Sequence, residues 1–155
     1  MNKNELYDSV IAQLESFLTG VRYECTILAN SSALLYDELP DLNWAGYYVL
    51  KDNKLVLSSF QGKVACQEIP LGRGVCGTAA QRKETVLVEN VHEFEGHIAC
   101  DSASNSEIVI PLIVNEQLYG VLDIDSPLLK RFDETDKKYL EQFADIIQKL
   151  LKEAL

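Results

Sequence analysis

Basic residues are scarce in this chain of 155 residues. Only 14 Lys and Arg stand against 24 Asp and Glu, which gives a formal net charge of −10 at pH 7. No basic stripe offsets this charge, and an acidic chain repels phosphate groups. The sequence therefore argues against nucleic acid or an anionic membrane surface as a partner.

Long uncharged apolar runs are also missing. The longest that we find, residues 25–36, is too short to span a bilayer. Charged residues begin at Lys3 and Glu5, so the N-terminus does not look like a signal peptide. We therefore expect a cytoplasmic protein, whose thiols stay reduced unless its chemistry uses them.

Three common site motifs are absent. No C-x-x-C pair occurs, which argues against a zinc ribbon or a thioredoxin-type motif. Three cysteines with His92 or His97 could surround a metal, but their wide spacing matches no compact site, so we expect none. The segment PLGRGVCG, residues 70–77, lacks the Lys-Ser/Thr ending of a phosphate loop, and no G-x-G-x-x-G occurs. Nucleoside triphosphate chemistry is therefore excluded.

What is present is an ordinary globular composition, with 47% hydrophobic and 25% charged residues. The length suits one domain, residues 1–155. Hydrophobic periodicity predicts helices at residues 2–20, 26–40 and 132–155, with Asp133 as the N-cap of the last. Strands are predicted at 44–51, 54–61, 84–90, 106–114 and 117–126, and a short strand, turn and helix at 67–83. This order favours an α+β fold in which helices pack on one face of an antiparallel sheet.

Three acidic residues are expected to converge. Asp123 and Asp125 are two apart on one strand, so they share a face, and a hairpin could bring Glu107 beside Asp125. Like charges at close range raise one pKa, so one carboxyl group could stay protonated as a donor while the other charge holds an ammonium group. The alternative is a solvated strand end.

Trp44 and Tyr48 are four residues apart and would point the same way from a strand. Core packing is the usual fate of such a pair. The alternative is a wall that contacts a small apolar group such as a methyl.

The cysteines are Cys25, Cys66, Cys76 and Cys100. Cys100 lies in a predicted loop of small residues, three after His97, which suits either a reactive thiol or an apolar filler. Cys66 and Cys76 near other predicted loops raise the prospect of a disulfide cycle, since a second thiol usually resolves a sulfenic acid; coincidence is the alternative. Cys25 adjoins an apolar helix face and is interpreted as structural.

Three segments together resemble a known family. LGRGVCGTA, VHEFEGHIACDSASNSEIVIPLIV and GVLDIDSP, in this order and spacing, closely resemble the free methionine-(R)-sulfoxide reductases, which have the GAF fold. The resemblance implies a GAF-like α+β fold: a six-stranded antiparallel sheet with helices on both sides and a pocket closed by loops. It also implies the substrate, free methionine-(R)-sulfoxide.

The resemblance assigns roles residue by residue. Cys100 matches the attacking cysteine, Cys66 the resolving one and Cys76 the third of the set. Glu107, Asp123 and Asp125 match the substrate-binding acids, with Glu107 and Asp125 expected to share the proton given to the sulfoxide oxygen. Trp44 and Tyr48 match the pocket aromatics. Backbone amides around Ile98, Ala99 and Cys100 are expected to hold the substrate carboxylate.

The implied cycle passes through a sulfenic acid at Cys100 and a Cys66–Cys100 disulfide. No bound cofactor is expected; thioredoxin, with thioredoxin reductase and NADPH, would supply electrons during oxidative stress. Pairing of terminal helices would give a homodimer. Two alternatives stay open: a non-catalytic GAF module that binds a small ligand, which would not need Cys66 and Cys100 together, and a redox sensor whose disulfide changes its shape.

Overall fold

The computed structural model describes residues 1–98, 100 and 103–155. The helices of this part are α1 (Lys3–Leu18), α2 (Glu24–Glu38), α3 (Gly74–Arg82), α4 (Glu134–Ala154) and the short 3₁₀ helix η1 (Val91–Glu93). The strands are β1 (Trp44–Lys51), β2 (Lys54–Gly62), β3 (Glu68–Pro70), β4 (Val86–Val88), β5 (Ser106–Val114) and β6 (Gln117–Ser126). All the predicted elements are thus found within a few residues of their expected bounds.

The strands form one sheet in the order β3-β2-β1-β6-β5-β4. Every neighbouring pair is antiparallel. The six-stranded antiparallel sheet implied by the resemblance is therefore confirmed. Two hairpins, β1–β2 and β5–β6, make its centre, where β1 and β6 pair.

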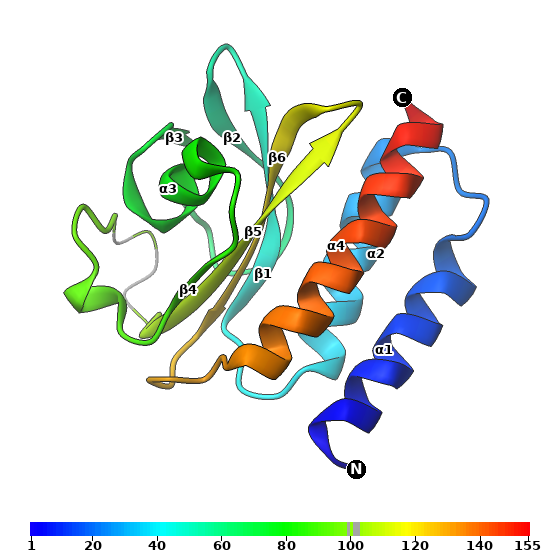
Figure 1. Ribbon diagram of the computed structural model, residues 1–155, viewed down its shortest axis with the longest axis horizontal. Helices are drawn as coiled ribbons and strands as arrows, with labels where there is room; N and C mark the ends of the chain where they lie inside the picture. The colour runs from blue at the N-terminus through cyan, green and yellow to red at the C-terminus, as the bar shows by residue number, and fades with distance from the viewer. Residues whose placement is uncertain (99, 101–102) are drawn as a thin grey trace.

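Helices cover both faces of the sheet (Figure 1). Helices α1, α2 and α4 lie on one face, here called the helix side, and α3 lies with the long loops on the other, here called the α3 side. The expectation from periodicity that all helices share one face is wrong, and the two-sided arrangement implied by the resemblance is correct. The physical reason is that the central strands are buried on both faces, as in β5, so each face needs a cover.

Strand β6 shows how the two faces differ. Leu122 and Ile124 point to the helix side, where they are fully buried in the larger apolar core. Asp123 and Asp125 alternate with them and point to the α3 side. This alternation follows from the two-residue repeat of a strand, and it places carboxyl groups on one side only.

The helix-side core depends on the amphipathic helix α4. Leu140, Phe143 and Ile147 are buried on its inner face. Asp133 is the N-cap, as predicted, and forms a capping box with Asp136. The helix therefore begins at a fixed point and turns one apolar face to the sheet.

Asp136 also connects the two ends of the chain. Its buried carboxylate accepts hydrogen bonds from the Tyr7 hydroxyl at 2.6 Å and from the Lys3 ammonium at 2.9 Å. Arg131 donates a third at 3.3 Å. Because a buried charge is costly without partners, this set of donors stabilises the contact between α1 and α4.

Tight turns close the two predicted hairpins. Asp52 and Asn53 join β1 to β2, and Asn115 and Glu116 join β5 to β6, all with positive φ as two-residue hairpin turns require. The β5–β6 pairing then shifts by one residue, because Tyr119 is an extra residue in β6 between the partners of Leu112 and Ile113. This bulge sets which β6 residues lie opposite the start of β5.

Among the described residues, none of the helices combines the length and hydropathy needed to cross a bilayer.

Candidate active site

Three carboxyl groups meet on the α3 side of the sheet. Glu107 of β5 lies directly opposite Asp125 of β6, and Asp123 lies two residues along the same strand face. All three are buried, with exposed fractions of 7%, 9% and 5% for Glu107, Asp125 and Asp123. The predicted convergence of these acids is therefore observed, and the alternative of a solvated strand end is wrong.

Their environment favours protonation. Burial raises the pKa of Glu107 well above its ordinary value, and the neighbouring charges of Asp123 and Asp125 raise it further. Burial and Asp123 likewise raise the pKa of Asp125 well above its usual range. No ion pair found among the described residues involves these three acids. The cluster can thus donate a proton, and it offers uncompensated negative charge to a bound cation.

The buried thiol of Cys76 completes this cluster from helix α3. Its Sγ lies 3.9 Å from Glu107 Oε2, at which it points as a donor. Burial raises the pKa of Cys76 well above its ordinary value, and the charges of Asp123 and Glu107 add to the effect. Cys76 is therefore held as a neutral thiol, which is the wrong state for a nucleophile.

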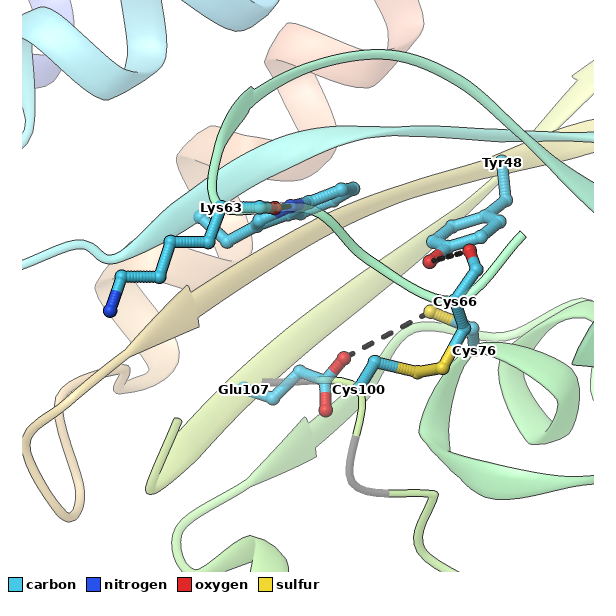
Figure 2. The surroundings of a disulfide bond; sticks show 7 residues. Tyr48, Lys63, Cys66, Cys76, Cys100 and Glu107 are labelled. Atoms are coloured by element: carbon cyan, nitrogen blue, oxygen red, sulfur yellow. Dashed lines mark hydrogen bonds between the residues drawn. A yellow bond between two sulfur atoms is a disulfide. The ribbon is translucent and has the colours of Figure 1, made fainter. Parts of the chain in front are cut away.

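A disulfide joins Cys66 and Cys100, with their Cα atoms 5.3 Å apart. Cys66 lies in the loop between β2 and β3, and Cys100 lies in the loop that leads into β5. Figure 2 shows the bond beside Cys76 and Glu107. Two of the three cysteines singled out in the sequence thus form a disulfide at the acid cluster.

Cys25 is different. It lies at the second position of helix α2 and is exposed to solvent. Its interpretation as a structural cysteine is wrong, because Ile27 and Leu28 form the buried face of that helix while Cys25 points outward.

These groups line one small cavity of about 40 Å³. Its lining includes Trp44, Tyr48, Arg73, Cys76, His97, Ile98, Cys100, Ser104, Glu107, Asp123 and Asp125. A small molecule with a cationic group and a reducible centre fits such a lining, because acids and sulfur face the same space.

Comparison with known proteins agrees with this geometry. The GAF domain family model matches residues 4–152. The free methionine-R-sulfoxide reductase of Escherichia coli is 52% identical over 151 residues, which cover 97% of this chain and 92% of that protein. The reduced form of fRMsr from Staphylococcus aureus superposes with a TM-score of 0.91 at 48% identity and covers 94% of both chains. Free methionine-R-sulfoxide reductase from Neisseria meningitidis, solved in complex with its substrate, gives a TM-score of 0.96 at 42% identity and covers 99% of this chain and 93% of that one.

This chain belongs to the free methionine-R-sulfoxide reductase family of GAF domains. The resemblance inferred from the three sequence segments is therefore confirmed.

The aromatic residues Trp44 and Tyr48 of β1 lie against the cavity. Trp44 and Tyr48 are both buried, and their ring centroids are 5.9 Å apart. Phe60 of β2 also stacks on Trp44, at 5.1 Å. The predicted core packing of the pair is confirmed, since both rings belong to the α3-side core. Both residues also line the cavity, and their contact with a methyl group stays a prediction.

The expected carboxylate-binding amides lie in the loop before β5. Ile98 lines the cavity, whereas Ala99 lies outside the described residues. That amides of this loop hold a carboxylate stays a prediction. The Cys100 amide donates to the Ile98 carbonyl at 3.0 Å, so in the disulfide form it is already occupied. Burial, followed by the nearby His92, lowers the pKa of His97, so His97 is a weaker base than an exposed histidine.

Two polar residues of the cavity, Ser104 and Arg73, were missed by the sequence reasoning. Ser104 is buried beside the acids and accepts a hydrogen bond from Asn43 at 3.0 Å. Arg73, exposed at the N-terminus of α3, reaches the cavity rim. The small polar run that contains Ser104 was the available signal for the first, whereas nothing local distinguishes Arg73 from a surface residue.

Besides an ammonium group, the cluster of acids and the Cys76 thiol could hold a metal ion. Ligand atoms of Cys76, Glu107 and Asp123 all lie within 4.8 Å of one another, and all three residues are buried. The same atoms would also hold an ammonium group, which needs no deprotonation of Cys76. The arrangement therefore does not require a metal.

Proposed function

We propose that this protein reduces free methionine-(R)-sulfoxide to methionine through a cysteine sulfenic acid. The observation that carries the proposal is the Cys66–Cys100 disulfide beside three buried carboxyl groups in one small cavity. A sulfoxide reductase needs both parts: a thiol to take up the oxygen and an acid to protonate it.

In the first step, the Cys100 thiolate attacks the sulfoxide sulfur. Glu107 and Asp125, which share a proton across the hairpin, donate a hydrogen bond to the sulfoxide oxygen and protonate it as the S–O bond breaks. The raised pKa values of both carboxyl groups support this role, because a proton is then available at neutral pH. The oxygen passes to the Cys100 sulfur as the bond between this sulfur and the substrate sulfur breaks, so Cys100 becomes a sulfenic acid and the thioether methionine leaves.

In the second step, the Cys66 thiol attacks the sulfenic sulfur of Cys100. Water leaves and the Cys66–Cys100 disulfide forms, as found here. Two thiols of a thioredoxin-type reductant then restore both cysteines by exchange and become oxidised in turn. Thioredoxin reductase and NADPH supply the electrons for that partner. Cys76, held as a thiol, is assigned at most an auxiliary part in recycling.

Selection of the free amino acid follows from the charge of the cavity. Asp123, with its acidic neighbours, would pair with the substrate ammonium, and Trp44 would flank the methyl group. A methionine residue inside a peptide has no ammonium group, so the buried Asp123 would be left without a partner. The substrate carboxylate would meet the amides at residues 98–100. Binding there requires the Cys100 amide to leave the Ile98 carbonyl when the disulfide opens.

A coupled assay tests the proposal. Reduced protein is mixed with thioredoxin, thioredoxin reductase and NADPH, and NADPH consumption is followed with free methionine-(R)-sulfoxide or its N-acetyl derivative. We expect turnover with the free amino acid and at least about a hundredfold less with the N-acetyl form. A ligand-binding module or a redox sensor would give no sustained turnover with either compound. Equal turnover with both compounds would contradict the ammonium site.

A further inference from the structure

The loop that carries Cys66 is fixed to the sheet at two backbone carbonyls. The Trp44 indole N–H donates to the carbonyl of Lys63 at 3.1 Å. The Tyr48 hydroxyl donates to the carbonyl of Cys66 itself at 2.9 Å. Figure 2 shows the second bond, with the Tyr48 hydroxyl facing the Cys66 carbonyl. Two aromatic residues of one strand thus hold the two ends of a four-residue segment.

The segment itself packs only in part. Ala65 and Cys66 are half-buried against the α3-side core. Between the two fixed carbonyls, the Val64 side chain is 88% exposed, so it adds little packing that would order the loop. Residues 64–66 belong to no helix or strand. Exposed loops with few packed side chains move readily, so the two hydrogen bonds have a large share in the position of Cys66.

The donors, in contrast, are rigid. Trp44 and Tyr48 lie on β1, a central strand that pairs with β2 on one side and β6 on the other. Both side chains are buried and stack on each other, and Phe60 also stacks on Trp44. Burial raises the pKa of Tyr48 far above neutrality, and the nearby acids add to this, so its hydroxyl stays protonated as a donor.

We propose that Trp44 and Tyr48 are positioning residues for the resolving cysteine: their N–H and O–H groups hold the Cys66 loop so that its sulfur meets Cys100. This deepens the proposed function, on whose resolving step it rests. In that step the Cys66 thiol displaces water from the Cys100 sulfenic acid, and the S–S bond forms as the S–O bond breaks. Holding the two sulfurs together raises the effective concentration of the attacking thiol.

One consequence is that the substrate pocket and the resolving loop share the same two side chains. Both residues line the cavity, while their N–H and O–H groups bind the loop. Their polar groups and their ring faces can therefore be separated by substitution.

The first test removes a single hydroxyl. Tyr48→Phe keeps the ring and loses the donor to Cys66, and its matched control is Tyr47→Phe. Tyr47 is the residue before Tyr48 on β1 and is also buried. Its hydroxyl forms a hydrogen bond with Ser31 Oγ at 2.8 Å on the helix side. Reduced protein is mixed rapidly with free methionine-(R)-sulfoxide, and methionine release and loss of thiols are timed in the same samples.

We expect the rate of disulfide formation, relative to methionine release, to fall about three- to tenfold in Tyr48→Phe, because this variant loses one hydrogen bond to the Cys66 loop. The ratio should stay at the wild-type value in Tyr47→Phe. An unchanged ratio in Tyr48→Phe, or an equal fall in both variants, would overturn the proposal.

The second test uses no sulfoxide, so its outcome is independent of the proposed function. The equilibrium between the Cys66–Cys100 disulfide and the two thiols is measured against glutathione for the wild type, Tyr48→Phe, Trp44→Phe and Tyr47→Phe. We expect the equilibrium constant for disulfide formation to fall about three- to tenfold in each of the first two variants only. If both keep the wild-type constant, the proposal is wrong even where turnover is normal. A fall seen in the absence of any sulfoxide reduction would sustain the positioning role and reject the function instead.

Discussion

The two faces of the sheet are made by the same strands but have opposite characters. On the helix side, Leu122 and Ile124 join a continuous apolar core with α1, α2 and α4. On the α3 side, Asp123 and Asp125 face a thiol, a disulfide and a carboxyl group across a small cavity. The comparison teaches that stability and chemistry are divided between alternate residues of one strand. Burial of uncompensated acids is unfavourable, and the apolar core on the other face offsets it.

The largest expected effect comes from the nucleophile. Cys100→Ser removes the thiol that takes up the oxygen, so turnover with free methionine-(R)-sulfoxide in the coupled assay should fall below detection. The control is Cys25→Ser, at an exposed position of α2, which should keep wild-type turnover. If Cys100→Ser kept its activity, another residue would have to be the nucleophile.

The next prediction compares neighbours on β6. Ile124→Ala leaves a cavity in the helix-side core and should lower the free energy of unfolding by about 2–5 kcal/mol in urea titrations. Asp125→Asn replaces a buried carboxyl group, whose ionisation beside Asp123 is unfavourable, with a neutral amide, so it should leave stability no lower than the wild type at neutral pH. Its kcat should fall about 10²- to 10⁴-fold, because a proton donor is lost.

The opposite pattern would contradict the division between the faces. If Asp125→Asn unfolded the protein while Ile124→Ala did not, the acids would be structural and the apolar core would be of minor importance.

The acid cluster should make the free energy of unfolding depend on pH. The pKa of Glu107 is raised in the folded chain, so above its ordinary value of 4.5 the folded chain binds more protons than the unfolded chain. Its contribution to the free energy of unfolding is therefore complete below that pH and is lost as the pH rises. We expect the stability of the wild type, measured in urea, to fall relative to Glu107→Gln as the pH rises above the ordinary value of 4.5. Parallel curves for the two proteins would show that Glu107 is ionised throughout.

The smallest effect is expected far from the cavity, where α1 meets α4. Tyr7→Phe removes the 2.6 Å hydrogen bond to Asp136, but Lys3 and Arg131 still pair with that carboxylate. The free energy of unfolding should fall by about 1 kcal/mol while turnover stays unchanged. Tyr36→Phe, on a partly exposed tyrosine of α2, serves as the control and should change neither quantity.

Much of the site could be predicted from the sequence, since it follows from local rules. The alternation of Leu122, Asp123, Ile124 and Asp125 assigns the faces of β6 without any structure. The family resemblance then pairs Cys66 with Cys100. Neither inference depends on knowing how the loops run.

What could not be predicted depends on irregular backbone. Glu107 is expected beside Asp125 from the sequence, but the bulge that this pairing needs was not foreseen. In a regular hairpin, counting back from the turn at Asn115 and Glu116 would place Glu107 opposite Ile124, on the helix side. The extra residue Tyr119 shifts the register by one and places Glu107 opposite Asp125 instead. The side on which α3 packs was also missed, although the uninterrupted apolar stretch of β5 is typical of a strand covered on both faces.

The hydrogen bonds of the Trp44 N–H and the Tyr48 O–H could not be predicted from the sequence for another reason. Their partners are backbone carbonyls of a loop, and any residue type offers the same carbonyl. The side chains of the loop therefore give no indication that these hydrogen bonds form.

The bond between Cys66 and Cys100 also changes the connectivity of the molecule. It spans 34 positions of sequence and so encloses β3, α3, β4 and η1 in a covalent ring, whereas α1, α2 and α4 lie outside it. Each proposed catalytic cycle would close this ring and open it again. A protease cut anywhere inside the ring would then release no fragment from the oxidised molecule, while the reduced molecule would separate into two pieces once unfolded.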